Sequence, residues 1–270
     1  MEQELAGLIE KLEAWFAPRK QVAIALSGGI DSSLVAWAAR RYLGREAVIA
    51  LISTSESLKA RDLAEARAFA ERFDINLVEI NSREMEDPQY LSNPIDRCFH
   101  CKTALYNEME KVIADRFPGS EVLNGNNASD LGDYRPGIKA ANEHHVFSPL
   151  ADCGFRKEDI RAVAKHFDLP NWNKPASPCL SSRFPYGEAI ESKKLAMVEA
   201  AEDLLNTYGF EDVRVRYLAG LARIEVLTDD IPKLRELILE IEAQLIVMGF
   251  DDCEIDEEGL VSGKMNRVLQ

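Results

Sequence analysis

A glycine-rich stretch near the start of the chain, residues 27–33 (SGGIDSS), combines residue types that could bind phosphate. Its two glycines let the backbone turn sharply and come close to a ligand, and its serine hydroxyls add hydrogen-bond donors. An apolar run of strand length, 22–26, precedes it, and a segment of helical character, 34–42, follows it. Because a strand that breaks and restarts as a helix leaves unpaired N–H groups facing one point, the stretch predicts an anion site.

Three of the five cysteines could act together in metal or redox chemistry. Cys98 and Cys101 lie three apart at the start of a predicted helix, so both thiols can point to one side, and a helix N-terminus favours thiolates. Cys179 lies in a proline-rich segment, 169–187. Three cysteines suffice for an iron–sulfur cluster if one iron keeps a non-protein ligand. Two thiolates alone would hold zinc only with two further ligands, for which the candidates are His100, His144 and His145.

An arginine-rich hairpin is predicted near residue 220. If Ala219-Gly220 is a two-residue turn, Arg216 faces Arg223, Arg214 faces Glu225, and the apolar residues of both strands share the other face. Two arginines directly opposite each other are unfavourable alone, and an anion between them would remove that cost. The three arginines are therefore candidates to bind a substrate phosphate or carboxylate; the alternative is a solvated polar face.

The apolar runs that position these groups alternate with helical patterns along the first half of the chain. The predicted strands 22–26, 47–52, 75–80 and 121–124 imply a parallel sheet with its ligand site at the carboxyl ends of the strands. Ser53 and Gly125 follow two of these strands, so we expect both at that edge. Ser57 is expected to cap the helix that follows Ser53.

Two later segments also have functional character. Residues 126–137 are rich in turn formers and follow a strand end, so Asp130, Asp133 and Arg135 could contact a nucleotide or magnesium; the alternative is an Asx-capped turn. The proline-rich segment carries Cys179 and Arg183 and marks a domain boundary. We expect one domain over 1–170, a loop over 171–187, and a small α+β domain over 188–270.

Composition narrows the classes of function. The 270 residues carry a net charge of −14, whereas nucleic-acid binders normally present a basic face. The longest apolar runs are too short to span a bilayer, and the N-terminus lacks the pattern of a signal peptide. A Cys-x-x-Cys pair without a disulfide framework is typical of a reducing compartment. The expectation is a cytoplasmic protein without membrane or nucleic-acid partners.

Several stretches together resemble a known family. Residues 27–33 resemble the SGGxDS loop of the PP-loop ATP pyrophosphatases, which cleave ATP between the α- and β-phosphates. Residues 130–137 (DLGDYRPG), 178–183 (PCLSSR) and 213–216 (VRVR) resemble the LarE family within that superfamily. The resemblance implies an α/β PP-loop domain with a parallel sheet, followed by a small α+β domain.

The resemblance also implies a reaction. LarE enzymes adenylate a carboxylate of pyridinium-3,5-biscarboxylate mononucleotide, release pyrophosphate, and transfer sulfur to give a thiocarboxylate for the nickel-pincer nucleotide cofactor of lactate racemase. In one branch the cysteine at the position of Cys179 gives up its own sulfur and becomes dehydroalanine. In another branch three cysteines hold a [4Fe–4S] cluster that delivers sulfide. This chain has Cys98 and Cys101 as well, so it resembles the second branch.

The candidate site residues fall into five groups. The catalytic residues would be Asp31, Cys179 and Arg183. Mg²⁺ would be bound by Asp31 and Asp133. The cluster ligands would be Cys98, Cys101 and Cys179, and the substrate would contact Arg214, Arg216, Arg223 and Glu225. ATP would contact Ala25, Ser27, Gly28, Gly29, Asp31, Ser32, Ser53, Gly125 and Arg135. The implied partners are a small nucleotide substrate, proteins of cofactor biosynthesis and further copies of the chain.

Three other functions remain open. A tRNA thiolase shares the PP-loop, the Cys-x-x-Cys pair and a distant third cysteine, but the acidic charge opposes it. An amide-forming synthetase that uses ammonia leaves the three cysteines unexplained. A non-catalytic nucleotide sensor is opposed by Asp31, Asp133 and the arginines around the phosphate site.

Overall fold

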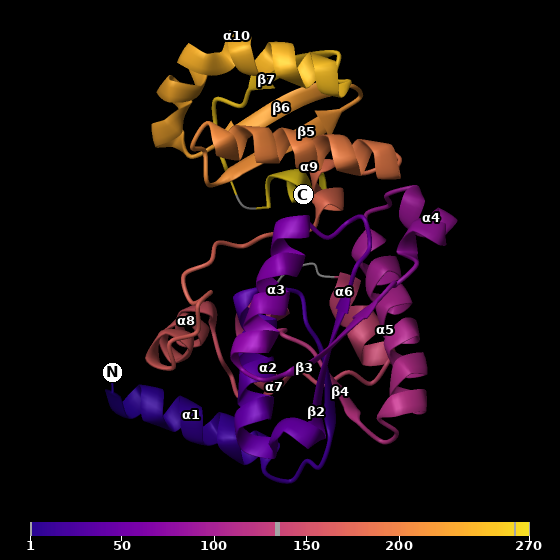
Figure 1. The fold of residues 1–270 in the computed structure, drawn as a ribbon, viewed down its shortest axis with the longest axis vertical. Coiled ribbons are helices and arrows are strands. Elements are labelled where there is room, and N and C mark those ends of the chain that lie inside the picture. The colour runs from indigo at the N-terminus through magenta and orange to yellow at the C-terminus, as the bar shows by residue number, and fades with distance from the viewer. Residues whose placement is uncertain (1, 133–135, 262, 270) are drawn as a thin grey trace. The chain divides into compact units, whose positions relative to one another are not determined.

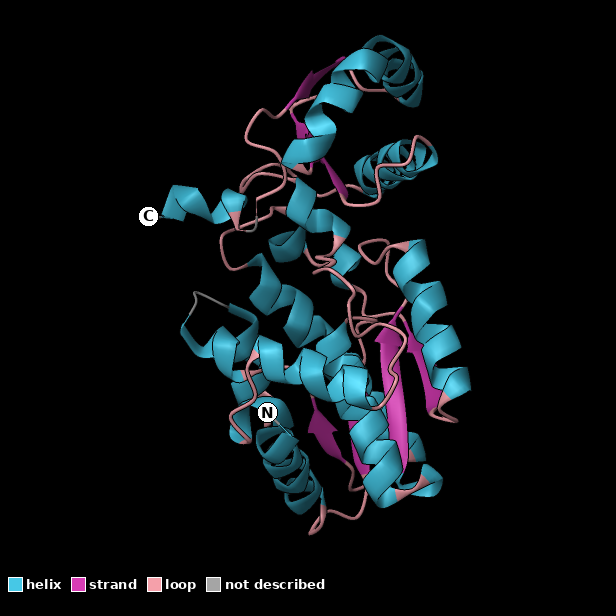
Figure 2. Ribbon diagram, turned by 90° about the vertical axis from the view of Figure 1, so that its left-hand side faces the viewer, coloured by secondary structure: helices cyan, strands magenta, loops and turns pink. Residues whose placement is uncertain are grey.

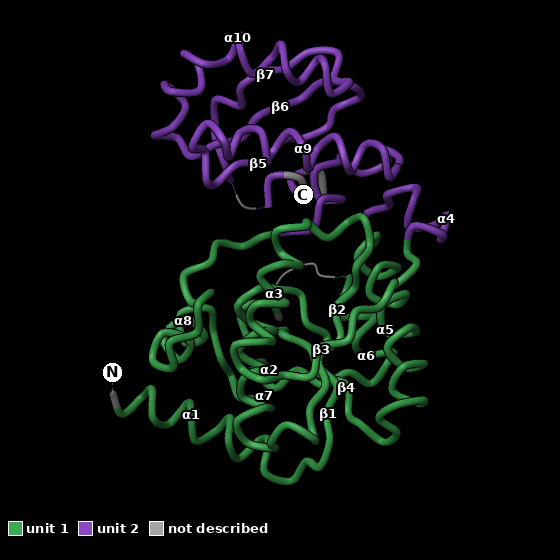
Figure 3. Tube along the Cα trace, in the orientation of Figure 1, with its two compact units in different colours: residues 1–84, 96–177 green, residues 85–95, 178–270 purple. Residues whose placement is uncertain are grey.

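The computed structural model describes residues 2–132, 136–261 and 263–269. The chain forms two compact units, one from residues 1–84 and 96–177, the other from residues 85–95 and 178–270 (Figure 3). Residues 85–95, which lie inside the range expected to form the first domain, therefore group with the second unit. Residues 171–177 of the proline-rich segment group with the first unit.

The first unit is built on a parallel four-stranded sheet of order β3-β2-β1-β4 (Figure 1). Its strands are β1 (Val22–Ala25), β2 (Val48–Ser53), β3 (Asn76–Ile80) and β4 (Glu121–Leu123). All three pairings are parallel. The predicted α/β class with a parallel sheet is confirmed. The strand ends that carry Ala25, Ser53 and Leu123 consequently lie at one edge of the sheet.

Helices cover both faces of this sheet (Figure 2). One face packs on α1 (Glu2–Phe16), α2 (Ile30–Leu43), α3 (Ala60–Arg72), α7 (Pro149–Asp152) and α8 (Lys157–His166). The other packs on α5 (Arg97–Arg116) and α6 (Pro136–Glu143). Side chains of β1 alternate between the faces: Val22 and Ile24 join the first core, and Ala23 and Ala25 the second. Burial on both faces explains why β1 and β2 read as continuous apolar runs.

The second unit contains a three-stranded sheet of order β5-β6-β7. Its strands are β5 (Val213–Leu218), β6 (Leu221–Val226) and β7 (Asp252–Ile255), and its helices are α4 (Pro88–Leu91), α9 (Ser192–Thr207) and α10 (Ile231–Met248). Strands β5 and β6 are antiparallel with Arg216 opposite Arg223 and Arg214 opposite Glu225, which confirms the predicted register. Ala219 and Gly220 both have positive φ, 49° and 100°, as a two-residue I′ turn requires.

One local expectation is wrong. Ser57 does not cap α3, which begins at Ala60 after Lys59. The hydroxyl of Ser57 instead donates to Oε1 of the buried Glu84, 3.0 Å away. The hydroxyl therefore donates to a carboxylate that the tertiary structure supplies, whereas as a cap it would accept from a backbone N–H of α3. No helix in the described part of the chain is long and apolar enough to cross a membrane.

Candidate active site

The phosphate loop, residues 27–29, connects β1 to α2. Gly28 has a φ of +73°, and a Cβ there would lie 2.9 Å from the carbonyl oxygen of Asp62, so only glycine fits. The Oγ atoms of Ser27 and Ser32 lie 3.0 Å apart, and the Ser32 hydroxyl also accepts from the Ser27 N–H. Gly29 is the N-cap residue of α2 and makes no side-chain cap. The first turn of α2 therefore keeps free N–H donors for an anion.

The end of β4 lies against the first turn of α2, directly after this loop. A Cβ on Gly125 would come 2.6 Å from the backbone nitrogen of Ser32, so the two backbones approach closely. Next to it, Asn124 is buried, and its Oδ1 accepts from the Asn126 N–H and from the Ser148 hydroxyl at 3.0 and 2.8 Å. Its Nδ2 is buried and has no acceptor among the described residues. Asn124 thus offers an unused donor, which the sequence alone did not single out.

A lysine reaches the loop from a distant part of the chain. Nζ of Lys157, the first residue of α8, pairs with Oδ2 of Asp31, while Oδ1 of Asp31 is buried without a hydrogen-bond partner in the described residues. Sequence reasoning missed Lys157 because it lies 126 residues from Asp31. Nothing in the sequence around Lys157 marked it as part of a phosphate site. Its ammonium puts a positive charge at the expected phosphate position.

Ser53 lies at the end of β2 within a buried polar network. Its Oγ is 2.5 Å from Oγ of Ser82, and that hydroxyl donates to Glu84, which also accepts from Ser57. Of the residues expected to contact ATP, the structure brings those on the ends of β1, β2 and β4 and on the α2 N-terminus to one edge of the sheet. These are Ala25, Ser27, Gly28, Gly29, Asp31, Ser32, Ser53 and Gly125.

Two predicted contacts, Asp133 and Arg135, lie outside the described residues. Their neighbour Asp130 is buried, and its Oδ2 accepts from the Asn127 N–H at 3.1 Å. The side chain of Asn127 in turn accepts from the Ser129 N–H at 2.9 Å. Before residue 133, the segment therefore contains an Asx turn at Asn127, which was the alternative interpretation of its composition.

The three cysteines of interest belong to different units. Cys98 and Cys101 lie in the first turns of α5, with Cys98 exposed and an Arg97 nitrogen 4.0 Å from its Sγ. Cys179 is the N-cap residue of a short 3₁₀ helix, Leu180–Arg183, in the second unit. Among the described residues, no three Cys, His, Asp or Glu side chains form a group that could hold a metal ion.

The remaining thiols, Cys153 and Cys253, have a different environment. Burial raises the pKa of each to about 11, and nearby carboxylates add to the shift, Asp152 at Cys153 and Glu242 with Asp252 at Cys253. Both remain protonated at neutral pH. Because the thiolate is the nucleophile and the metal ligand, these two thiols are unsuited to either role.

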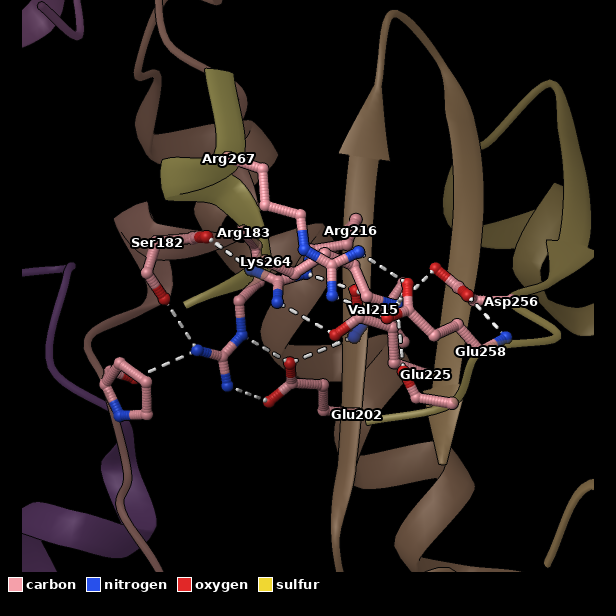
Figure 4. Close-up of polar contacts among 12 residues, drawn as sticks. Ser182, Arg183, Glu202, Val215, Arg216, Glu225, Asp256, Glu258, Lys264 and Arg267 are labelled. Atoms are coloured by element: carbon pink, nitrogen blue, oxygen red, sulfur yellow. Dashed lines mark hydrogen bonds and ion pairs between the residues drawn. The ribbon is translucent and has the colours of Figure 1, made fainter. Parts of the chain in front are cut away.

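The hairpin arginines differ from one another. Arg216 is buried and makes a bidentate pair with Glu225, Nε to Oε1 at 3.0 Å and Nη2 to Oε2 at 2.8 Å, and its Nη1 donates to the Ser182 carbonyl at 2.7 Å (Figure 4). Arg223 is half-exposed and pairs with Glu254. The two opposed arginines are therefore each neutralised by a carboxylate, so no bound anion is needed to offset their repulsion, and their contact with a substrate stays a prediction.

Arg183 holds the turn that carries Cys179. It is 1% exposed and makes a bidentate pair with Glu202 at 2.7 and 3.1 Å (Figure 4). Its Nη1 donates to the Pro178 carbonyl at 3.0 Å and to Oγ of Ser182 at 2.8 Å. All the guanidinium nitrogens therefore have partners within the protein, and these contacts hold the backbone before Cys179 and the side chain of Ser182 after it.

Arg214 alone among these arginines has no ion-pair partner in the described part of the chain. It is 8% exposed. Burial lowers the pKa of its guanidinium, the charges of Arg183 and Arg216 lower it further, and the charges of Glu225 and Glu202 offset only part of this shift. A buried cation beside two others is costly unless an anion compensates it. Arg214 is therefore the residue of this face best suited to bind an anionic ligand.

Comparisons with known proteins agree with this architecture. The family model of NAD synthase matches residues 3–91, which include the phosphate loop. A protein of Synechocystis sp. is 41% identical over 98% of this chain and 99% of its own length. The pyridinium-3,5-bisthiocarboxylic acid mononucleotide synthase of Lactiplantibacillus plantarum is 36% identical over 93% of this chain and 90% of its own. A glutamine-hydrolysing GMP synthase of Clostridium botulinum is 24% identical, over 83% of this chain but only 47% of its own length.

The match to the Lactiplantibacillus synthase runs through both units rather than through the nucleotide-binding unit alone. The predicted resemblance is thereby confirmed, and the chain belongs to the LarE family of ATP-using sulfur transferases within the PP-loop superfamily.

Proposed function

We propose that the protein uses ATP to activate a carboxylate of pyridinium-3,5-biscarboxylate mononucleotide and converts it into a thiocarboxylate for nickel-pincer cofactor biosynthesis. The observation that carries the proposal is the uncapped N-terminus of α2 with Lys157 beside it. The name of the Lactiplantibacillus relative supplies the substrate class.

In the first step a substrate carboxylate oxygen attacks the α-phosphorus of ATP, and the bond to the β-phosphate breaks to release pyrophosphate. The free N–H groups of α2 and the ammonium of Lys157 stabilise charge that develops on the phosphates. Oδ1 of Asp31, buried and unpaired among the described residues, is the kind of oxygen that Mg²⁺ binds, so Asp31 fits this ion. Asp133 would be a second ligand, and Mg²⁺ would neutralise the leaving pyrophosphate.

In the second step a sulfur nucleophile attacks the acyl carbon of the adenylate and displaces AMP, a far better leaving group than a carboxylate oxygen. With Cys179 as the nucleophile, the product is a thioester. Loss of the α-proton and cleavage of the Cβ–S bond would then leave a thiocarboxylate on the substrate and dehydroalanine in the protein.

We favour a [4Fe–4S] cluster, held by Cys98, Cys101 and Cys179, as the source of sulfur. Two thiols within one turn of a helix N-terminus, with an arginine beside the first, are a donor set suited to iron. The cluster would supply sulfide for transfer. Iron and sulfide analysis after anaerobic purification tests this choice directly.

For substrate binding we propose that Arg214 binds the phosphate of the mononucleotide. Arg216, Glu225 and Arg223 shape the surrounding face, and Arg183 holds the Cys179 turn. We further propose that the protein works with other proteins of cofactor biosynthesis and as a homo-oligomer, and that it binds neither nucleic acid nor membranes.

The experiment is anaerobic incubation with ATP, Mg²⁺ and pyridinium-3,5-biscarboxylate mononucleotide, with pyrophosphate measured enzymatically and the product by mass spectrometry. We expect substrate-dependent pyrophosphate release and a thiocarboxylate product. The similarity to GMP synthase makes an ammonia-using synthetase the alternative. An amide formed with added ammonia would support that alternative, and thiolation of tRNA would instead identify a tRNA thiolase.

A further inference from the structure

A largely buried ion pair joins Lys174 to two carboxylates of α3. Nζ of Lys174 lies 2.8 Å from Oδ1 of Asp62 and 2.6 Å from Oε2 of Glu65. The side chains of Lys174 and Asp62 are only 14% and 8% exposed, whereas that of Glu65 is 39% exposed. Removing one partner of such a pair leaves the other charge buried and uncompensated. The Lys174–Asp62 pair is therefore expected to stay formed and to hold Lys174 against α3.

The same ammonium binds the phosphate loop itself. Nζ of Lys174 donates to the Gly28 carbonyl oxygen at 3.1 Å. In a trans peptide the carbonyl and the following N–H point in opposite directions. With the Gly28 oxygen held at Lys174, the Gly29 N–H points away from the lysine and donates to Oγ of Ser27 at 3.4 Å. Lys174 thus orients one N–H donor of the loop.

The second oxygen of Asp62 holds the segment that leads to Cys179. Oδ2 accepts from the Ser177 hydroxyl at 2.7 Å. Ser177 is two residues before Cys179, and a chain spans at most about 3.3–3.6 Å per residue, so the two Cα atoms are within about 7 Å of each other. Because Asp62 holds the side chain of Ser177, the short covalent link from Ser177 restricts where Cys179 can lie.

We propose that Asp62, Lys174 and Ser177 form a positioning clamp through which one carboxylate sets both the phosphate loop and the start of the sulfur-transfer segment. This inference rests on the proposed function and deepens it. An acyl-adenylate that sulfur does not reach is hydrolysed by water to the carboxylic acid and AMP. The clamp raises the probability that sulfur attacks first, because it restricts where Cys179 can lie.

The test is the ratio of thiocarboxylate formed to pyrophosphate released. For Ser177→Ala we expect pyrophosphate release within about twofold of wild type and a ratio lowered about tenfold, since a hydrogen bond to a charged group is lost. Ser177→Thr keeps the hydroxyl and should restore the ratio. Lys174→Met should lower the ratio and also slow pyrophosphate release, because the Gly28 peptide is freed. Lys111→Met, which removes an exposed ion pair with Glu108, is the matched control.

The outcomes separate the clamp from the proposed function. If the wild-type protein releases no pyrophosphate with the substrate, the proposed function fails. If the wild-type protein works and Ser177→Ala keeps its ratio, the clamp is overturned. Ser177 is exposed, so its truncation leaves the fold intact even if Lys174→Met does not fold. A ratio that falls equally in Lys111→Met would also overturn the clamp.

Discussion

Arg214 and Arg216 lie two residues apart on β5, but their truncation should affect different properties. We expect Arg216→Ala to lower stability and Arg214→Ala to weaken substrate binding. Arg216→Ala removes the partner of Glu225, whose side chain is 1% exposed, and strands a buried carboxylate. Breaking a buried pair costs about 3–5 kcal/mol. Nζ of Lys264, 3.7 Å from Oε1 of Glu225, compensates part of the charge. We therefore expect a loss in the free energy of unfolding near the lower limit, about 3 kcal/mol.

Arg214→Ala removes a buried cation that has no carboxylate partner among the described residues. Truncation loses packing along the aliphatic stem and attraction to Glu225 and Glu202, but it relieves the burial of a charge and the repulsion from Arg183 and Arg216. The free energy of unfolding should therefore change by about 1 kcal/mol or less. If Arg214 binds the substrate phosphate, the variant should lose about 1.5–3 kcal/mol of binding free energy, roughly 10- to 150-fold in Kd. Affinity for ATP should be unchanged.

Urea unfolding and calorimetric titration with the mononucleotide and with ATP measure both effects. The double variant Arg216→Met/Glu225→Leu is the control, because replacing both partners by apolar residues should recover most of the stability lost in Arg216→Ala. Wild-type substrate affinity in Arg214→Ala would refute the assignment of the anion site. Unchanged stability in Arg216→Ala would refute the assignment of Arg216 to a structural pair.

Other variants test the two reaction steps. Asp31→Ala should abolish pyrophosphate release, because it removes the oxygen assigned to magnesium; release at the wild-type rate would eliminate the phosphate-site assignment. Lys157→Ala should slow pyrophosphate release about 10²- to 10³-fold, the usual cost of removing one preorganised charge, and a rate within twofold of wild type would contradict that role. Cys179→Ala should stop sulfur transfer while pyrophosphate release continues. If a cluster is the sulfur source, Cys98→Ala and Cys101→Ala should also stop transfer and lose iron. A single completed turnover in those variants, with Cys179 lighter by the elements of hydrogen sulfide, would show that Cys179 is sacrificed instead.

The elements of the fold were largely predictable from local pattern. Strands β1 and β2 read as short apolar runs because both their faces are buried, and the turn at Ala219-Gly220 fixes the hairpin register. The pairing of charges on that hairpin was not predictable. Glu225 faces Arg214 across the strands but bonds the diagonal Arg216, because long side chains reach beyond the directly opposite position.

The site was predictable only where it is local in sequence. Residues 27–33 indicated the phosphate loop because strand, glycines and helix follow one another. Lys157 and Lys174 reach the loop from 126 and 146 residues away, and no local spacing marks such contacts. The capping role assigned to Ser57 failed for the same reason, since its actual partner, Glu84, is supplied by the tertiary structure.

The path of the chain between the two units limits how the protein can be divided. The chain passes from one unit to the other at residue 85, returns at 96 and leaves again at 178. Residues 85–95 bond to the later segment: Oη of Tyr90 is 2.5 Å from Oγ of Ser181, and Nδ2 of Asn93 donates to the Pro185 carbonyl at 2.7 Å. A fragment ending at residue 177 would therefore carry Tyr90 and Asn93 without their partners. Neither unit is a contiguous module that could be excised, transplanted or exchanged between relatives by a single crossover in the gene.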